Sequence, residues 1–223
     1  MADYDLIIIG AGPGGYVAAI RAAQLGMKVA CVEKERTLGG TCLNVGCIPS
    51  KALLYSSEKY AELLYQTEEH GIKTGKIELD LVKLMQRKEK IVKQLTAGIG
   101  FLFKKNKITH INGTASFVDE QNIKVKSSKE STLSAKNFII ATGSSSIAIP
   151  SISVDEKSTV TSTGALSLSS VPKTMLVIGG GYIGLEMGSV WSRLGTKVTV
   201  VEALDQIVPT MDAEIAAQFM KSL

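Results

Sequence analysis

The hydrophobic pattern at the start of the chain predicts a strand, a turn, a helix and a second strand. Residues 5–9, DLIII, form a short apolar run of strand length that leads directly into the glycine-rich run GAGPGG. The next segment, YVAAIRAAQLG, is helix-forming and ends at Gly26, which suits a helix C-cap. KVACVE at residues 28–33 is the second strand. This order is typical of a βαβ unit.

The glycines of the turn are spaced as in dinucleotide-binding folds. Gly10 would permit the tight turn, Gly12 would let a pyrophosphate approach the backbone, and Gly15 would let the helix pack closely on the strand. The phosphates are then expected at the helix N-terminus. Glu33, about twenty residues further on, is expected to bind a ribose 2′-hydroxyl. Cys31, on the second strand, is expected to be a buried apolar thiol.

The same pattern occurs a second time in the chain. TMLVIGGGYIGLEMGSVWSRLGTKVTVVE at residues 174–202 repeats the first unit at a constant offset of 169 residues, the separation of Gly10 and Gly179. The repeat predicts a second dinucleotide-binding unit, in which Met187 and Trp191 are expected to pack in the core. Its cofactor-binding residues correspond to those of the first unit and are Gly179, Gly181, Gly184 and Glu202.

Between the two units the pattern changes from helices to strands. Two helices are expected near residues 50–69 and 80–105. Three segments then alternate apolar and polar residues and are separated by turn residues, which predicts an antiparallel meander over residues 108–119, 122–127 and 132–143. The end of the third segment, FIIATG, is apolar throughout and is expected to rejoin a buried parallel sheet.

A dithiol lies shortly after the first unit, in the segment GGTCLNVGCIPSK. On a regular helix, residues five apart are separated by about 7.5 Å of rise, whereas a disulfide needs its Cα atoms within about 7 Å. Gly46 would let the backbone leave the helix just before Cys47, and Pro49 suits the first turn of the next helix. Cys47 would then lie at a helix N-terminus, which favours thiolate over thiol. Cys42 and Cys47 are therefore expected to form a redox-active disulfide.

Two alternatives for the dithiol are a structural disulfide and a metal site. The chain has three cysteines and no export signal, which disfavours a structural disulfide. Zinc usually takes a CxxC pair with a second pair elsewhere, and the sequence has no such arrangement. We therefore expect no metal.

The dithiol indicates which cofactor each unit would hold. A flavin reacts directly with a thiolate, whereas nicotinamide carries a hydride, so FAD is expected in the first unit and the nicotinamide in the second. No arginine follows Glu202 to receive a 2′-phosphate, which favours NAD over NADP.

These elements predict an α/β fold with two Rossmann-like units, an antiparallel β-meander inserted in the first unit, and an incomplete second unit. A domain boundary fits the segment 144–153, which is rich in Ser, Ile and Pro. We expect an FAD-binding domain that carries the dithiol at residues 1–148, and the N-terminal part of an NAD-binding domain at residues 149–223.

Three segments together resemble the flavoprotein disulfide reductases: GGTCLNVGCIPSKALL, the ATG at residues 141–143, and GGGYIGLE. The resemblance covers essentially the whole chain, and within the family it favours the lipoamide enzymes. It implies oxidation of the dihydrolipoyl group of a 2-oxo acid dehydrogenase complex, with FAD and NAD as cofactors. A mercuric-ion reductase or another disulfide reductase is the related alternative, and a non-catalytic dinucleotide-binding fragment is an alternative of a different class.

The resemblance also implies roles for single residues. Cys47 would face the flavin, and Cys42 would exchange with the dithiol substrate. Lys51 would lie near the reactive edge of the flavin and pair with Glu186. The remaining implied cofactor contacts are Thr41, Thr142 and Gly143 for FAD and Tyr182 for the nicotinamide side of the ring.

The family's acid–base histidine does not match this sequence. In the family it belongs to a His-Pro segment of a C-terminal dimerisation domain, and neither His70 nor His110 stands in that context. We therefore expect the N-terminal portion of a longer reductase, which would be a homodimer, and little or no activity of this chain alone.

Composition narrows the partners and the compartment. The chain has 223 residues and a formal net charge of +4, and its lysines are spread along amphipathic stretches such as DLVKLMQRKEKIVKQL. Neither nucleic acid nor a membrane is an expected partner. Asp3 and Asp5 precede the first apolar run, which is unlike a secretory signal. The expected location is the bacterial cytoplasm or the mitochondrial matrix.

Overall fold

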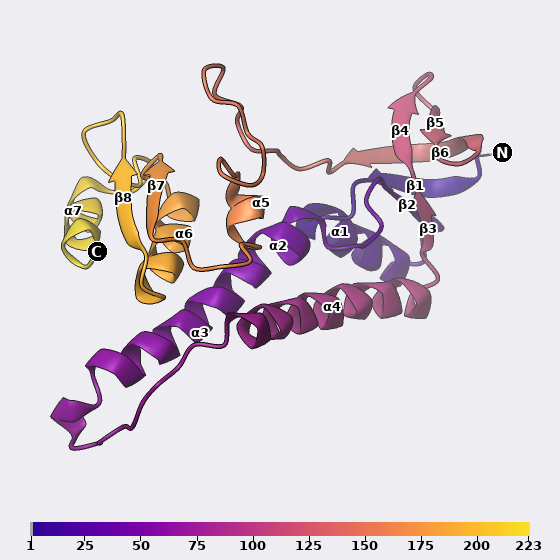
Figure 1. Cartoon of the computed structure of the whole chain (residues 1–223). Coiled ribbons are helices and arrows are strands. Elements are labelled where there is room, and N and C mark those ends of the chain that lie inside the picture. The colour runs from indigo at the N-terminus through magenta and orange to yellow at the C-terminus, as the bar shows by residue number, and fades with distance from the viewer. Residues whose placement is uncertain (1) are drawn as a thin grey trace. The chain divides into compact units, whose positions relative to one another are not determined.

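A computed structural model describes residues 2–223, which form an α/β structure that divides into two compact units (Figure 1). The first unit comprises the residues up to Ile48 together with Lys90–Ser145, and the second comprises Pro49–Glu89 together with Ser146–Leu223. The division therefore falls within two helices, α3 (Cys47–Tyr65) and α4 (Leu81–Lys105). The two domains expected at residues 1–148 and 149–223 stay predictions.

The first unit is built on a six-stranded sheet with the order β3-β2-β1-β6-β5-β4. The strand β1 pairs in parallel with β2 and β6, and β2 pairs in parallel with β3. The remaining pairs, β4 with β5 and β5 with β6, are antiparallel. The strands are β1 (Tyr4–Ile9), β2 (Val29–Glu33), β3 (Thr109–Asn112), β4 (Thr114–Phe117), β5 (Asn122–Lys126) and β6 (Glu130–Ile140).

Alternating side chains of β1 bury both faces of this sheet. Leu6 and Ile8 belong to a core cluster with residues of α1 (Pro13–Gln24) and of the second half of α4. Ile7 and Ile9 point to the opposite face, where they join a second cluster with the β5 side chains Ile123 and Val125. Because side chains alternate along a strand, one apolar run supplies both clusters. The meander thus covers the face that the helices leave open.

The expected meander begins later than the sequence pattern indicated. The run 108–119 divides at Gly113 into two strands, and the first, β3, lies beside β2 in the parallel sheet. A Cβ at Gly113 would lie 2.7 Å from Cγ1 of Val125, and the Gly113 N–H donates to the Glu33 carbonyl at 2.8 Å. Only a glycine fits this close passage between the two strands. The prediction of one meander strand over 108–119 was therefore wrong, whereas the antiparallel arrangement of β4, β5 and β6 is confirmed.

The long strand β6 connects the two parts of the sheet. Its first half, from Glu130 to Ser134, pairs with β5, and its second half, from Ala135 to Ile140, pairs with β1. The expected return of FIIATG to the parallel sheet is thus confirmed. Its expected burial is wrong, because Ile140 is 67% exposed and belongs to no core cluster of the described residues.

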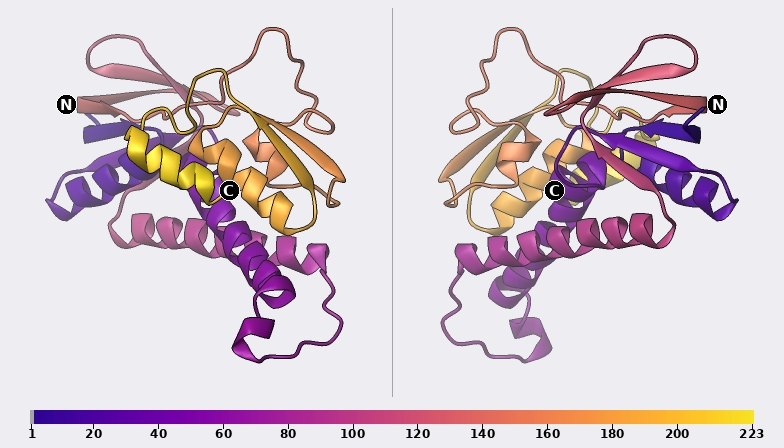
Figure 2. Two further views of the ribbon diagram at one scale, coloured as in Figure 1. Left: turned by 90° about the vertical axis from the view of Figure 1, so that its left-hand side faces the viewer. Right: turned by 90° about the vertical axis from the view of Figure 1, so that its right-hand side faces the viewer.

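The second unit contains a two-stranded parallel sheet of β7 (Thr174–Ile178) and β8 (Lys197–Val201). The helix α6 (Tyr182–Arg193) lies along both strands, as both views of Figure 2 show. Trp191, Met187 and Val190 of α6 form a core cluster with Leu53 of α3, which confirms the expected packing of Trp191 and Met187. The other elements of this unit are η1 (Glu68–His70), α5 (Ser162–Ala165) and α7 (Ala213–Lys221).

Two buried side chains cap the C-terminal end of the short helix α5. The Trp191 Nε1–H donates to the Ala165 carbonyl at 3.0 Å, and the Lys88 ammonium donates to the Leu166 carbonyl at 2.7 Å. The last carbonyls of a helix have no partner within the helix, so each needs a donor when it is buried. Trp191 and Lys88 therefore join α5 to α6 and to α4.

Replacing Trp191 by Phe tests this cap. Trp191→Phe keeps an aromatic ring in the core but leaves the Ala165 carbonyl without its donor, so we expect the free energy of unfolding to fall by about 1–3 kcal/mol. Urea unfolding followed by far-ultraviolet circular dichroism measures it, since the chain has a single tryptophan and the variant has no indole fluorescence. Met187→Leu, a control of similar volume in the same cluster, should cost less than about 1.5 kcal/mol. Equal losses for the two variants would show that the hydrogen bond contributes nothing.

Candidate functional site

The first glycine turn joins β1 to α1, and two of its glycines are required by the approach of backbone to backbone. Gly10 has a φ of +101°, and a Cβ there would lie 2.2 Å from the Ala141 carbonyl oxygen. A Cβ at Gly15 would lie 1.8 Å from the carbonyl oxygen of Gly10. In the second unit a Cβ at Gly184 would lie 2.6 Å from the Gly179 carbonyl oxygen. These positions hold each helix against the strand that precedes it.

The middle glycine of each turn has a different environment. A Cβ at Gly12 would meet its nearest atom, the Cα of Gly40, at an ordinary contact distance of 3.7 Å. A Cβ at Gly181 would meet nothing within 4 Å. Packing among the described residues therefore does not require a glycine at either position. The missing Cβ instead leaves the backbone open to a ligand, as expected for a turn that binds a pyrophosphate.

Both helices that follow the turns begin without a side-chain cap from the described residues. Gly12 and Gly181 are the N-cap residues of α1 and α6, and neither helix has an acidic residue in its first turn. In contrast, the carboxylate of Asp212 accepts the amides of Glu214 and Ile215 at the start of α7. The uncapped N–H groups and the helix dipole of α1 and α6 favour an anion at these two ends.

One carboxylate braces each glycine turn against the strand that follows its helix. Glu33 is 6% exposed, and its two oxygens accept the amides of Ala11 at 2.7 Å and of Glu35 at 2.9 Å. In the second unit Glu202 accepts the amides of Gly180 at 2.6 Å and of Leu204 at 3.0 Å. The two sets of partners are again 169 residues apart. Sequence reasoning identified both acids as ribose ligands but missed this bracing role, and ribose binding stays a prediction.

The loop that follows each braced strand also bonds to the glycine turn. In the first unit the Gly39 N–H donates to the Ala11 carbonyl at 2.9 Å. At the matching position of the second unit the Val208 N–H donates to the Gly180 carbonyl at 2.8 Å, and Val208 has a φ of +43°. The structural repeat therefore extends beyond the sequence motif to the loop behind it.

Two adjacent glycines seat the dithiol segment on the first glycine turn. Gly39 and Gly40 have φ values of +105° and +58°, and helix α2 (Gly40–Val45) begins at the second of them. A Cβ at Gly40 would lie 2.5 Å from the Cα of Gly12. The segment that carries Cys42 thus starts in direct backbone contact with the turn expected to bind FAD. Sequence reasoning missed this role of Gly39 and Gly40. Two adjacent glycines just before a predicted helix could have indicated a close backbone contact there.

The backbone breaks between the two cysteines at Gly46, as expected. Cys42 is half-buried in α2, and Cys47 is the exposed first residue of α3. Gly46, between the two helices, has φ −138° and ψ −119°, and a Cβ there would lie 2.9 Å from the Thr41 carbonyl oxygen. The expected position of Cys47 at a helix N-terminus is therefore confirmed, although the helix expected near residues 50–69 begins earlier and spans Cys47–Tyr65.

The third cysteine has the character of a core residue. Cys31 is fully buried on β2, and its Sγ lies 3.7 Å from the Gly10 carbonyl oxygen. Burial first, and the nearby Glu33 carboxylate second, raise the pKa of the Cys31 thiol to about 12. It stays protonated at neutral pH, as expected for an apolar thiol.

The structure brings Lys51 and Glu186 together. The Lys51 ammonium of α3 lies 2.5 Å from Oε1 of Glu186 on α6, and the two side chains are 60% and 24% exposed. Ser50 donates to the other carboxylate oxygen, Oε2, which sequence reasoning missed. The polar side chain of Ser50 at a buried position of α3 could have indicated a hydrogen-bond partner on another element. The placement of the pair beside a flavin stays a prediction.

The other expected cofactor residues lie at strand ends and helix starts. Thr142 and Gly143 lie just beyond the end of β6, after Ala141, whose N–H donates to the Ile9 carbonyl at 2.8 Å. Tyr182 is the exposed first residue of α6. Thr41 is exposed on α2. Their contacts with a cofactor stay predictions.

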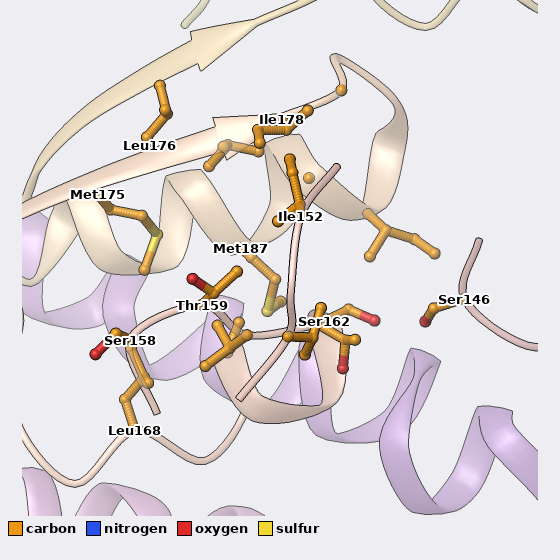
Figure 3. Close-up of a pocket in the computed structure, with 18 of the residues that line it drawn as sticks. Ser146, Ile152, Ser158, Thr159, Ser162, Leu168, Met175, Leu176, Ile178 and Met187 are labelled. Carbon is orange, nitrogen blue, oxygen red and sulfur yellow. The ribbon is translucent and has the colours of Figure 1, made fainter. Parts of the chain in front are cut away.

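The second glycine turn borders a cavity of about 930 Å³. Gly179, Gly181 and Tyr182 are among its lining residues. Figure 3 shows Met175 and Ile178 of β7 and Met187 of α6 among the side chains that line it, together with Ile152 and Ser162. The volume lies in the range of small-molecule sites, which reach about 1,000 Å³. Space for a ligand therefore exists beside the turn expected to hold NAD.

Residues 2–223 contain neither a membrane-crossing helix nor a cluster of metal-ligating side chains. None of the helices in this range combines the length and the apolar character needed to cross a membrane. Within the same residues, no three or more His, Cys, Asp or Glu side chains gather as a metal site would require.

Comparison with known proteins decides the family. A family model described as pyridine nucleotide-disulphide oxidoreductase matches residues 4–223. The chain belongs to this family.

Members of this family match the chain over nearly its whole length. It is 56% identical to mitochondrial dihydrolipoyl dehydrogenase of Pisum sativum, over 99% of the chain and 44% of that relative. It is 58% identical to mitochondrial dihydrolipoyl dehydrogenase of Schizosaccharomyces pombe, over 96% of the chain and 42% of that relative. The chain thus spans less than half the length of these curated relatives.

A solved structure from the same family supports the fold. The Cu(II) complex of the HOCl-induced flavoprotein disulfide reductase RclA from Escherichia coli has a TM-score of 0.81 with this chain at 29% identity. The match covers 100% of the chain and 47% of that structure. The expected α/β fold with Rossmann-like units is therefore confirmed.

The two glycine turns of the chain fit a dinucleotide. Open backbone at Gly12 and Gly181, uncapped N–H groups at the starts of α1 and α6, and a carboxylate beside each turn are the groups such a cofactor needs. The segment that carries Cys42 starts in contact with the first of these turns.

Alanine substitutions separate the packing role of a glycine from a ligand-binding role. Gly15→Ala forces its Cβ into the Gly10 carbonyl, so we expect the free energy of unfolding to fall by about 3 kcal/mol. Gly12→Ala meets no close atom and should change it by less than about 0.5 kcal/mol, while lowering the affinity for FAD. Urea unfolding and the absorbance of bound flavin in the full-length protein measure the two effects. Unchanged FAD binding in Gly12→Ala would show that this turn does not hold the pyrophosphate.

Acid titration of Glu202→Gln tests the carboxylate brace. The amides of Leu204 and Gly180 lower the pKa of Glu202 from its ordinary value of 4.5. A lowered pKa stabilises the folded chain above that ordinary value, and the stabilisation is lost as the pH falls through the lowered pKa. We therefore expect Glu202→Gln to be less stable than the wild type at neutral pH, with a difference that shrinks on acidification. Thermal unfolding over this pH range measures it, and a difference that does not vary with pH would contradict the brace.

Proposed function

We propose that this chain is a segment of a dihydrolipoyl dehydrogenase, which oxidises dihydrolipoyl groups with NAD. One observation carries the proposal: identities of 56% and 58%, over 99% and 96% of the chain, to two relatives that bear this name. The dithiol segment and the duplicated glycine turn supply the redox cysteines and the two dinucleotide sites that such a reaction uses. The activity is proposed for the full-length protein.

The reaction proposed for the two cysteines is a dithiol–disulfide exchange. In the oxidised protein Cys42 and Cys47 would be joined by a disulfide. A thiolate of the substrate attacks Cys42, so that a mixed disulfide forms and Cys47 leaves as a thiolate. The second substrate thiolate then displaces Cys42 and closes the lipoyl disulfide. Two electrons have moved from the substrate to the pair of protein thiols, and two protons are released from the substrate thiols.

The position of Cys47 suits it as the leaving group. It is the first residue of α3 and therefore lies at the end of the helix where the backbone N–H groups have no partner within the helix. The positive end of the helix dipole there would stabilise the negative charge that develops on a departing sulfur. Cys42 is half-buried on α2, in the segment that Gly39 and Gly40 seat on the first glycine turn.

The two cofactors would occupy the two glycine turns. Bound FAD would accept the electron pair from the protein dithiol, and NAD would carry it away as a hydride. The residues proposed to hold FAD are Gly10, Gly12, Gly15, Glu33, Thr41, Lys51, Thr142 and Gly143. Those proposed to hold NAD are Gly179, Gly181, Tyr182, Gly184 and Glu202. An electron acceptor at the first turn would lie beside the segment that carries Cys42, which supports this assignment.

The proposal extends to location and partners. Both relatives compared above carry the word mitochondrial in their names, which supports a mitochondrial matrix location. The substrate would then be the dihydrolipoyl group of a 2-oxo acid dehydrogenase complex, and the full-length protein would be a homodimer.

Turnover of dihydrolipoamide tests the proposed function. The full-length protein should reduce NAD with dihydrolipoamide, as measured by the absorbance of NADH. Cys42→Ser and Cys47→Ser should abolish turnover, because either change removes the disulfide. Cys31→Ala serves as the control and should keep the activity, since Cys31 is buried on β2. Reduction of mercuric ion or of another disulfide, without oxidation of dihydrolipoamide, would favour a related reductase.

The visible spectrum assigns the two sulfur atoms. Cys42→Ser leaves Cys47 without a disulfide partner, so its sulfur stays reduced beside the flavin and we expect long-wavelength charge-transfer absorption without added reductant. Cys47→Ser should lack this absorption under all conditions. The reverse result would exchange the proposed roles of the two cysteines.

A further inference from the structure

Three side chains form a bridge between helices α3 and α6 in the second unit. Glu186 of α6 receives the Lys51 ammonium on Oε1 at 2.5 Å and the Ser50 hydroxyl on Oε2. Ser50 and Lys51 are consecutive residues of α3. We call these three residues the Ser50–Glu186–Lys51 bridge. Each oxygen of the carboxylate thus has its own donor, one neutral and one charged.

Ser50 is a buried residue whose hydroxyl is aimed at this carboxylate. Its exposed fraction is 4%, and no buried side-chain nitrogen or oxygen of the described residues lacks a hydrogen-bond partner. A serine inside a helix commonly donates to the carbonyl four residues earlier. The Ser50 hydroxyl instead donates to a side chain on a different helix. Its hydrogen bond therefore acts between α3 and α6.

The Lys51–Glu186 pair needs a second anchor to have a fixed geometry. The Lys51 side chain is more than half exposed, and an ion pair with such a partner is weak. A lysine also loses rotamer entropy when it is held in one place. A carboxylate that is free to turn would not hold the ammonium at a single position. The hydrogen bond from Ser50 removes that freedom by fixing Oε2.

We propose that Ser50 is a positioning residue, which fixes the Glu186 carboxylate so that Oε1 holds the Lys51 ammonium in one place. This inference deepens the proposed function and rests on it, because Lys51 is the cation proposed to lie beside the flavin. Ser50 touches neither the substrate nor a cofactor in this scheme. It acts on Lys51 only through Glu186.

Chemical labelling of single lysines tests the bridge in the chain without cofactor. A short pulse of acetic anhydride, followed by peptide mass spectrometry, measures the acetylation rate of each lysine. An ammonium held by a carboxylate reacts slowly, so we expect Ser50→Ala to raise the Lys51 rate by about threefold, as befits a weak exposed pair. Ser50→Thr retains a hydroxyl at this position and should restore the wild-type rate.

Three further measurements supply the controls. Glu186→Gln removes the charged acceptor and should raise the Lys51 rate at least as far as Ser50→Ala does. Lys59, which pairs with Glu62 on α3, should react equally in all variants. Lys88 is buried, so its rate reports any loosening of the second unit. A structural role of Ser50 alone would raise the Lys88 rate together with that of Lys51.

Several outcomes would overturn the proposal. An unchanged Lys51 rate in Ser50→Ala would show that the hydroxyl does not position the ammonium. A parallel rise at Lys88, or no restoration by Ser50→Thr, would reduce Ser50 to a packing residue. A wild-type Lys51 rate in Glu186→Gln would show that the bridge does not form in solution. None of these measurements involves FAD or dihydrolipoamide, so their failure is distinct from a failure of the proposed function.

Discussion

The carboxylate that closes each glycine turn is the interaction on which the two nucleotide units depend. Glu33 and Glu202 each accept one amide from the turn and one from the loop after their own strand. A single side chain therefore fixes the end of a strand, the start of a loop and the peptide groups of the turn. Glu33 is buried and must have such donors, because an unpaired charge would be too costly to bury. The hydrogen bonds from the turn amides to Glu33 and Glu202 hold the glycine turns that precede α1 and α6 in place.

Backbone contacts at glycine residues position the segment that carries the two cysteines. A Cβ at Gly40 would lie 2.5 Å from the Cα of Gly12, so only a glycine fits at position 40. Gly46 then separates α2 from α3. Three glycines thus set where the segment starts, where it bends and where Cys47 begins a new helix. The chemistry of the cysteines depends on glycine positions at both ends of α2.

The sequence was most informative where chemistry and repetition coincide. Spacing and residue type alone predicted the repeat of the glycine motif at an offset of 169 residues, the break at Gly46 and the burial of Cys31. The division of residues 108–119 did not, because the alternation of side chains is the same in a parallel and in an antiparallel strand. The exposure of Ile140 and the bond from Ser50 to Glu186 also escaped prediction, because both depend on which distant element packs nearby. Patterns along the chain therefore specified the local elements, and tertiary contacts decided their partners.

Val208 shows how firmly the backbone geometry of the repeat is imposed. It occupies the position that Gly39 has in the first unit and has a positive φ, although a β-branched residue is disfavoured there. Its N–H nevertheless makes the same bond to the glycine turn, and its side chain is buried in a small core cluster. The same loop conformation therefore forms with a valine in one unit and a glycine in the other. Two copies of one architecture can diverge freely in side chains while a shared main-chain hydrogen bond preserves their common shape.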